Sequence, residues 1–249
     1  METDIKIIDV VDSTNTVLEK LADEGAAEGT CVVSFCQTKG QGRSGRSFFS
    51  PEGGNLYMSL LLRPKDPAVT DMITVMSAVA VIRALKERYG IEPGIKWVND
   101  IILGGRKICG MVARARNIGQ DAFHVILGIG VNIYDPENIP SDIADIYGSV
   151  TGRKCDIAKD EQRSASVSLA KTILREFANL YEHFDKAGTV DEYRRNCIVI
   201  GKRVSYISGN DTTEARVLDI DQDGGIVLET NGCARTYRDG EIRIRLQDM

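Results

Sequence analysis

Histidine is scarce in this 249-residue sequence, and its cysteines are widely spaced. There are two histidines and six cysteines, and no two cysteines form a Cys-x-x-Cys pair. Structural zinc sites take four such ligands, usually with closely spaced pairs, so the sequence argues against a zinc site. Most of the cysteines lie in apolar stretches, which predicts buried, reduced thiols.

Long apolar runs and an excess of positive charge are also absent. No stretch reaches the roughly 18 uninterrupted apolar residues of a membrane span. Residues 1–15 lack the basic segment and apolar run of a secretory signal. The net charge is −5, whereas nucleic-acid binders usually carry a basic surface. We therefore expect a cytoplasmic protein that binds neither membranes nor nucleic acid.

The apolar share of 43% is enough for a substantial core, and the chain length allows one large domain followed by a small one. Apolar periodicity predicts helices over residues 14–24, 70–88, 162–184 and 190–196. Strands are expected over residues 5–10, 30–36, 55–62, 94–103, 107–115 and 123–133. From about residue 198, short strands alternate with turn signals such as Asn231-Gly232 and Asp239-Gly240. The sequence thus predicts an α+β domain followed by a small antiparallel barrel.

Residues 37–54 form the most unusual segment, which we call the glycine-rich loop. It has no apolar periodicity, it contains Gly40 and Gly42, and its Lys39, Arg43 and Arg46 precede the first acid. Glycines let a backbone approach a ligand closely, and arginine forks suit phosphate or carboxylate groups. The pattern matches neither a P-loop nor a dinucleotide fingerprint. A solvated loop and an anion site both remain open.

Three further clusters carry polar groups at strand ends. In Lys96-Trp97-Val98-Asn99-Asp100, the lysine could pair with phosphate oxygens, and Asn99 or Asp100 could reach a magnesium ion. The alternative is a hairpin with an Asn-Asp turn. Trp97 is expected in the core.

Lys107 follows a Gly-Gly turn, and it is either an exposed hairpin charge or a cation that points at an anionic ligand. Gly128 and Gly130 weaken a strand unless something must approach it closely. Asn132, at the end of that strand, could then bind a ligand. A bend of the sheet or a contact with a helix is the alternative.

In this order and spacing, five segments resemble the signature of biotin–protein ligases: Asp12-Ser-Thr-Asn15, residues 37–46, Lys96–Asp100, Arg106–Gly110 and Gly128–Asn132. The resemblance implies a class II synthetase-like core over residues 1–197, with a mixed or antiparallel sheet and helices on one face. It implies a small SH3-like domain over residues 198–249. Regulatory members of the family carry a winged helix before the Asp-Ser-Thr-Asn segment. Because that segment begins here at residue 12, we expect the monofunctional form.

The resemblance also implies substrates, partners and residue roles. The substrates would be biotin and ATP with Mg²⁺, and the acceptor would be a biotin carboxyl carrier protein. The resemblance suggests a homodimer as one option, and the sequence leaves the oligomeric state open. Biotin would contact Ser13, Thr14, Asn15, Gln37, Gly40, Gln41, Gly42, Arg43, Lys107 and Gly110. ATP would contact Arg43, Arg46, Lys96, Asn99, Lys107 and Asn132. Arg43, Lys107 and Asp100 would be catalytic, with Asp100 also a metal ligand, and residues 134–148 would fold over the adenine.

Two positions depart from the family pattern. Gln41 stands where an arginine is common, which removes one cation from the glycine-rich loop, and Val98 replaces the usual proline. A lipoate–protein ligase and a non-enzymatic biotin-binding regulator remain as alternatives. The central expectation is electrostatic: Arg43 and Lys107 should meet in one pocket that accepts two anionic reactants.

Overall fold

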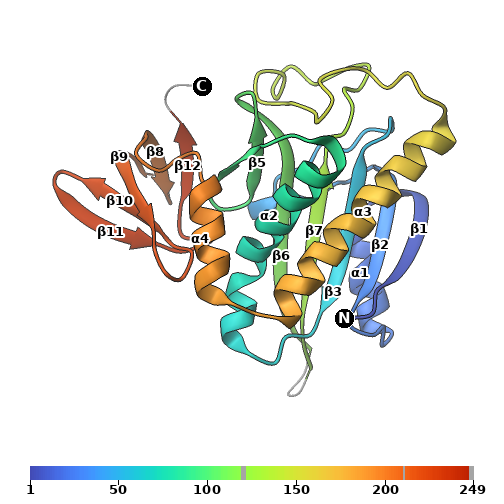
Figure 1. Cartoon of the computed structure of the whole chain (residues 1–249), viewed down its shortest axis with the longest axis horizontal. Coiled ribbons are helices and arrows are strands. Elements are labelled where there is room, and N and C mark those ends of the chain that lie inside the picture. The colour runs from blue at the N-terminus through green and yellow to red at the C-terminus, as the bar shows by residue number, and fades with distance from the viewer. Residues whose placement is uncertain (119–121, 210, 247–249) are drawn as a thin grey trace.

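The computed structural model describes residues 1–118, 122–209 and 211–246. Its first sheet has seven strands in the order β1-β2-β3-β7-β6-β5-β4 (Figure 1). Within it, β1 runs parallel to β2 and every other neighbouring pair is antiparallel, so the sheet is mixed. The strands are β1 (Asp4–Val11), β2 (Thr30–Gln37), β3 (Leu56–Leu62), β4 (Gly94–Lys96), β5 (Asp100–Leu103), β6 (Arg106–Ile118) and β7 (Ala122–Val131).

One predicted strand is wrong in its extent. Residues 94–103 form two short strands rather than one, because the chain turns back after Lys96 and β4 pairs with β5. The apolar Trp97 and Val98 continue the strand pattern in sequence, but they lie in the turn and are buried there. The hairpin alternative for this segment therefore describes the backbone better.

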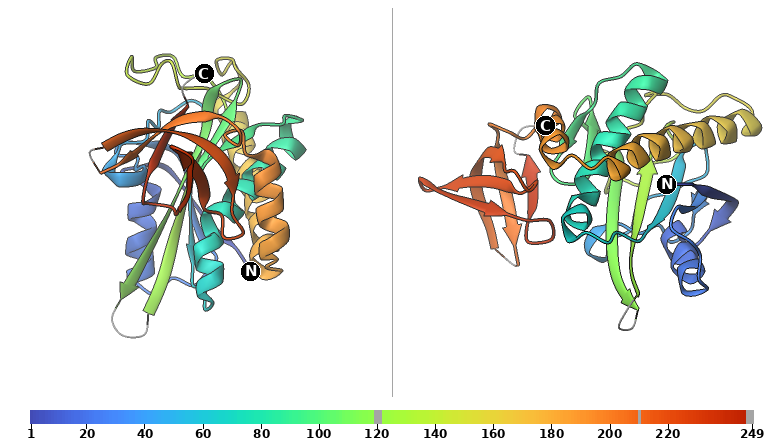
Figure 2. Two further views of the ribbon diagram at one scale, coloured as in Figure 1. Left: turned by 90° about the vertical axis from the view of Figure 1, so that its left-hand side faces the viewer. Right: turned by 60° about the horizontal axis from the view of Figure 1, so that its bottom comes forward.

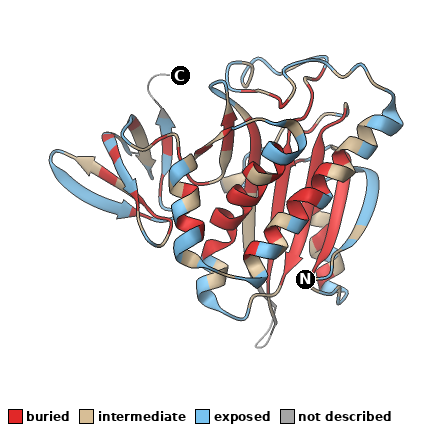
Figure 3. Ribbon diagram, in the orientation of Figure 1, coloured by how far each residue is buried: buried red, intermediate tan, exposed pale blue. Residues whose placement is uncertain are grey.

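Helices α2 (Pro67–Tyr89) and α3 (Lys159–Glu182) cover one face of the sheet (Figure 1). Their buried side chains join a core with alternate residues of the central strands, including Met58, Leu60, Leu127 and Ile129. Alternation along a strand sends successive side chains to opposite faces, so the intervening residues face away from this core. Figure 3 shows the central strands buried and β1 exposed at the edge.

The short helix α1 (Thr14–Asp23) lies on the opposite face, which the sequence analysis did not anticipate. Its Leu18 and Ala22 pack on Val32, Leu61 and Ile126 in a second, smaller core. The α+β class is confirmed, but the expectation that the helices share one face holds for α2 and α3 and not for α1. Beside α1, this face of the sheet is left for the glycine-rich loop.

The C-terminal strands form a five-stranded antiparallel sheet in the order β11-β10-β9-β8-β12. They are β8 (Arg203–Ser208), β9 (Asp211–Ile220), β10 (Ile226–Thr230), β11 (Cys233–Tyr237) and β12 (Arg243–Leu246), and they follow helix α4 (Lys186–Asn196). Figure 2 shows this sheet beside the first one rather than over either of its faces. The division into domains at residue 198 stays a prediction.

Polar contacts connect the C-terminal sheet to the first domain. The indole Nε1 of Trp97 donates to the Gly224 carbonyl at 3.0 Å, and Trp97 is 4% exposed, which agrees with its predicted place in the core. The Arg194 guanidinium of α4 donates to the Ile220 carbonyl at 2.7 and 3.0 Å. These contacts hold Gly224 beside the turn between β4 and β5, and the end of β9 beside α4.

Helix α2 is long and apolar enough to cross a membrane by length and composition alone, but most of it is buried against the sheet as a core helix. Three of the six free cysteines, Cys31, Cys109 and Cys197, are buried, whereas Cys36 and Cys155 are half-buried and Cys233 is exposed. Burial raises the pKa of Cys31 to about 12 and that of Cys197 to about 11, so both thiols are protonated and unreactive.

Candidate active site

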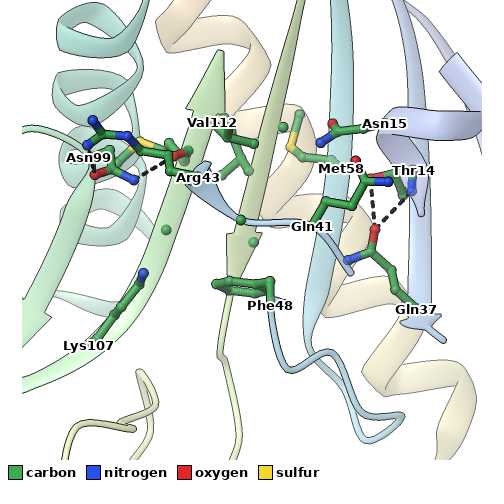
Figure 4. Close-up of a pocket in the computed structure, with 16 residues that line it drawn as sticks. Thr14, Asn15, Gln37, Gln41, Arg43, Phe48, Met58, Asn99, Lys107 and Val112 are labelled. Atoms are coloured by element: carbon green, nitrogen blue, oxygen red, sulfur yellow. Dashed lines mark hydrogen bonds between the residues drawn. The ribbon is translucent and has the colours of Figure 1, made fainter. Parts of the chain in front are cut away.

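A pocket lies on the sheet face opposite α2 and α3, between α1 and the glycine-rich loop (Figure 4). Nine of the predicted site residues line it: Thr14, Asn15, Gln37, Gln41, Gly42, Arg43, Asn99, Lys107 and Gly110. The strands contribute Met58, Met111, Val112, Gly128, Ile129 and Gly130, and the loop adds Phe48. Segments far apart in sequence therefore meet at one site.

One end of the pocket is polar and uncharged. The side-chain oxygen Oε1 of Gln37 accepts from the Thr14 backbone N at 2.8 Å and from its hydroxyl at 3.1 Å. Gln37 Nε2 donates to Ser50 Oγ at 2.9 Å. Ser59 Oγ lies 2.7 Å from both Thr14 Oγ1 and Asn15 Oδ1. This network fixes the orientation of amide and hydroxyl groups that could hold a neutral polar ligand group.

Glycines form the floor beside this network. A Cβ atom at Gly128 would lie 2.5 Å from Asn15 Oδ1, and one at Gly130 would lie 2.5 Å from the Phe48 ring. A Cβ at Gly110 would lie 2.9 Å from the Lys107 side chain. Gly128 is approached by Asn15 of helix α1, which is the helix contact that the sequence left as an alternative, and Gly130 is approached by Phe48 of the glycine-rich loop. A side chain at either glycine would fill the space that these two residues occupy.

The other end of the pocket is cationic. Lys107 Nζ lies 2.6 Å from Asp100 Oδ1 and 5.6 Å from the centre of the Phe48 ring. Arg43 Nη1 donates to Asn99 Oδ1 at 2.9 Å, and Asn99 Nδ2 donates to the Met111 carbonyl at 2.7 Å. Lys107 and Arg43 thus border the same pocket from different elements (Figure 4). The expectation that these two cations share a pocket is met by the geometry.

Arg43 has a second partner that the sequence did not suggest. Its Nη2 forms an ion pair with Asp239, in the turn between β11 and β12. The side chain of Arg43 is 20% exposed and that of Asp239 is 43% exposed. The C-terminal sheet therefore reaches the glycine-rich loop directly, through a contact between residues far apart in the chain.

More cations lie just outside the pocket, around the β4–β5 hairpin. Burial lowers the pKa of Lys96; Asp100 opposes this shift, while Lys107, Arg46 and Arg245 add to it. Burial also lowers the pKa of Arg46, with Arg243 as the next contribution. The two arginines of β12 were missed in the sequence, where they look like exposed strand charges. Together these side chains form a positive region that suits a polyanion.

Several predicted site residues do not line the pocket: Ser13, Gly40, Arg46, Lys96, Asp100 and Asn132. Ser13 is the residue that precedes α1 and is 1% exposed. Asn132 is 3% exposed and its Nδ2 donates to the Gly148 carbonyl at 2.9 Å. The Lys107 backbone N donates to the Ile146 carbonyl at 2.7 Å, and Gly148 N donates to the Lys107 carbonyl at 2.9 Å. Asn132 and residues 146–148 thereby support the backbone that carries Lys107.

Among the described residues, no group of three or more His, Cys, Asp or Glu side chains could hold a metal ion. Asp100 offers a single carboxylate, whose Oδ1 is buried next to Lys107. Magnesium in nucleotide sites takes one or two carboxylates and completes its shell with phosphate oxygens and water. Asp100 therefore fits a magnesium ion that arrives with a nucleotide.

A sequence profile of the Biotin/lipoate A/B protein ligase family matches residues 7–132. The bifunctional ligase/repressor BirA of Bacillus subtilis is 34% identical over 238 residues, which cover 92% of this chain and 70% of that protein. The biotin–[acetyl-CoA-carboxylase] ligase of Mycobacterium tuberculosis is 26% identical over 240 residues, which cover 92% and 85%.

The chain belongs to the biotin protein ligase family. In three dimensions it is similar to the biotin protein ligase from Aquifex aeolicus in complex with biotin and ATP. The TM-score is 0.78 at 25% identity, with 98% of this chain and 100% of that chain covered. The predictions of the family, of the α+β ligase fold and of the enzyme class, a biotin–[acetyl-CoA-carboxylase] ligase, are confirmed. The roles of the individual residues stay predictions.

Proposed function

We propose that this protein activates biotin with ATP to biotinyl-5′-AMP and transfers biotin to a lysine of a biotin carboxyl carrier protein. The observation that carries the proposal is that one pocket joins an uncharged hydrogen-bonding end, around Thr14 and Gln37, to a cationic end with Lys107 and Arg43. Biotin has a neutral ureido head and a carboxylate tail, so its two ends match the two ends of the pocket.

The first step brings two anions together. A biotin carboxylate oxygen attacks the α-phosphorus of ATP, the bond to the β-phosphate breaks, and pyrophosphate leaves. Lys107 and Arg43 offset the repulsion between the reactants and stabilise the charge that builds on the phosphorus oxygens. The Asp100 carboxylate, 2.6 Å from Lys107 Nζ, positions that ammonium group. Asp100 would also hold Mg²⁺, which supplies charge neutralisation for the phosphates.

The leaving pyrophosphate would lie in the positive region around the β4–β5 hairpin. Arg46, Lys96 and Arg245 surround this region, with Asp100 as the acid among them. Burial destabilises the protonated form of Lys96, and the negative charge of a phosphate group beside it would stabilise that form again. Arg245 thus gives the C-terminal domain a role in nucleotide binding.

In the second step the amine of the acceptor lysine attacks the acyl carbon of the adenylate, an amide forms, and AMP leaves. The amine must lose a proton, and in this proposal the Asp100 carboxylate, beside Lys107, would accept or orient it. The adenylate is a mixed anhydride that water hydrolyses, so the glycine-rich loop must cover it. The carrier protein as acceptor, and the cytoplasm as the compartment, belong to this proposal, and the six free thiols agree with a reducing compartment.

The proposal is tested by incubating the protein with labelled biotin, ATP and Mg²⁺ and measuring the labelled adenylate that stays bound to the protein. Lys107→Ala should lower the rate of pyrophosphate release by roughly 100-fold or more, because it removes a cation from the reacting carboxylate and phosphate. Lys171→Ala, on the exposed side of α3, is the matched control. Normal pyrophosphate release by Lys107→Ala would contradict its assigned role.

Lipoate is the rival substrate, since the matched family includes ligases of both acids. The Thr14, Gln37 and Ser59 network favours a ligand head that both donates and accepts hydrogen bonds, as the ureido ring does. A dithiolane ring has no such groups and would gain no hydrogen bond from this network. Titration with both acids decides: tighter binding of lipoate would overturn the assignment of biotin.

A further inference from the structure

The glycine-rich loop is held across the pocket by a side-chain contact that runs from α1 to β6. Gln41 lies between the two elements: its Nε2 donates to Thr16 Oγ1 at 3.2 Å, and its Oε1 accepts from Arg114 Nη1 at 2.5 Å. Arg114 Nη2 also lies 3.4 Å from the Gly42 carbonyl oxygen. We name this chain of contacts, Thr16–Gln41–Arg114, the loop strap.

The loop strap crosses the pocket itself. Gln41 and Gly42 both line the pocket, and so do Thr14 and Asn15 of α1 and Val112 of β6. Figure 4 shows the loop segment with Gln41 and Arg43 passing from the side of Thr14 to the side of Asn99. Arg114 lies two residues after Val112 on the same face of β6, because side chains alternate along a strand. The strap therefore anchors the loop on both sides of the site.

The backbone of the loop cooperates with this anchor. Gln41 forms an antiparallel bridge with Ser47, and Gly42 N donates to the Arg46 carbonyl at 2.7 Å. Phe48 N donates to the Gly40 carbonyl at 2.8 Å. Residues 40–48 are thus one small hairpin, so a hold on Gln41 also fixes Arg43 at its tip and Phe48 at its base.

Glutamine is suited to the middle position for a chemical reason. Its amide accepts a hydrogen bond from Arg114 and donates one to Thr16 at the same time. An arginine at position 41 has donors only, so it could not accept from Arg114, and the two cations would repel each other. The residue at position 41 and the residue at position 114 therefore depend on each other, and the cation absent from the loop at position 41 is supplied from β6.

We propose that Arg114 is a positioning residue that, through Gln41, keeps the glycine-rich loop closed over the reactive adenylate. This inference rests on the proposed function for the identity of the covered ligand, but the strap consists only of contacts among this chain's own residues. Arg114 touches none of the reacting groups in this scheme. Its loss should therefore act on retention of the adenylate more than on its formation.

The first experiment uses the whole protein without ligands and follows trypsin cleavage after Arg43 and Arg46. Arg114→Met should speed this cleavage about tenfold, because a hydrogen bond to a charged group is lost. Gln41→Leu should act similarly, and the Arg114→Met, Gln41→Leu double variant should be no faster than either single variant, because both break the same strap. Gln41→Leu changes a half-buried loop residue rather than a residue of the sheet, and it keeps the test valid if Arg114→Met does not fold.

Arg116→Met is the matched control. Arg116 lies on the same strand and face, is also an arginine, and contacts Asp23 at 3.4 Å instead of the loop. It should leave the cleavage rate unchanged. Gln41→Arg alone should speed cleavage, because it places two donors opposite each other. The double exchange, Gln41→Arg with Arg114→Gln, again pairs a donor with an acceptor between positions 41 and 114, and it should return the cleavage rate toward that of the parent. Unchanged cleavage in Arg114→Met, or equal acceleration in Arg116→Met, would overturn the strap.

The second experiment loads the protein with biotin, ATP and Mg²⁺ and measures release of the adenylate. Arg114→Met should release the adenylate about tenfold faster than the parent does, with a smaller change in the rate of adenylate formation. The release rate of Arg114→Lys should lie between those of the parent and Arg114→Met. Equal loss of formation and retention would assign Arg114 to the chemistry and overturn its positioning role. If the parent forms no adenylate while trypsin still distinguishes Arg114→Met from Arg116→Met, the proposed function fails and the strap stands.

Discussion

Strands β3 and β7 present buried aliphatic side chains to α2 and α3, whereas toward α1 and the glycine-rich loop they present small residues at Ser59, Gly128 and Gly130. The first face is filled by side chains of the strands themselves. The second leaves room that Asn15 and Phe48 enter from other elements. Because a strand alternates its side chains, one stretch of sequence serves both a core and a pocket.

The comparison separates stability from function at neighbouring residues. A substitution on the α2 face, at a residue outside the pocket lining, should remove core packing and leave the pocket intact, and one at Gly128 or Gly130 on the α1 face should do the reverse. Leu127 and Gly128 are adjacent in β7 and face opposite ways. The following predictions use such residues, in order of the expected effect.

Leu127→Ala should lower the free energy of unfolding by about 3 kcal/mol, because it leaves a cavity under α2 where Leu127 is 0% exposed. Chemical denaturation measures this, with Leu218→Ala as control, since Leu218 is 39% exposed and the same atoms are removed there. Adenylate formation below the unfolding transition should stay normal. A large loss of activity in folded Leu127→Ala would show that the two faces are not separate.

Gly128→Ala should weaken biotin binding by about 2 kcal/mol, roughly 30-fold, with a much smaller loss of stability. The new Cβ would lie 2.5 Å from Asn15 Oδ1, so Asn15 must move out of its contact with Ser59. Calorimetric titration with biotin measures the change. The control for binding is Gly152→Ala, whose Cβ would contact nothing within 4 Å; because Gly152 has a φ of 62°, alanine is strained there and this variant does not serve as a control for stability. If Gly128→Ala binds biotin as the parent does, the floor of the pocket is not where the ligand lies.

The strands of this sheet and the segments that form the pocket could be predicted from the sequence. Alternation and β-branched content predicted the strands, and the glycine-rich loop stood out because it lacked any periodicity. Gly128 and Gly130 indicated a close approach, which the neighbouring Asn15 and Phe48 explain. The motifs also predicted that Arg43 and Lys107 meet, although they lie on different elements.

Other features were out of reach because they depend on contacts between distant parts of the chain. Which face α1 covers is set by how the chain crosses the sheet, and its apolar stripe is compatible with either face. Ser59 looks like one polar residue in an apolar strand until Thr14 and Asn15 are placed beside it. Asp239 and Arg245 carry no local signal, because their partners belong to the first domain.

Asp239→Asn should tighten ATP binding about threefold, a change typical of an ion pair that is partly exposed. The carboxylate of Asp239 competes with a phosphate for the Arg43 guanidinium, and asparagine keeps its shape without the charge. Equilibrium binding of ATP at low and high salt measures the effect, which salt should reduce. Asp211→Asn, at an exposed position of β9, is the control. Weaker ATP binding in Asp239→Asn would mean that Asp239 positions Arg43 rather than competing for it.

Lys96→Met should raise the free energy of unfolding at neutral pH by about 0.5 kcal/mol while weakening ATP binding, as expected where a site residue is held in an unfavourable environment. Burial lowers the pKa of Lys96 in the folded protein, so protonated Lys96 disfavours folding at any pH below that lowered value. The penalty disappears as the pH rises from the lowered pKa toward 10.5, the ordinary value for lysine. Denaturation at pH 7 and at higher pH should therefore show the gain shrinking. Lys6→Met, on the exposed β1, is the control for the change in net charge at pH 7. A gain that grows with pH would contradict the burial of a charged Lys96. It would also contradict the inference that this cation lowers the stability of the folded protein.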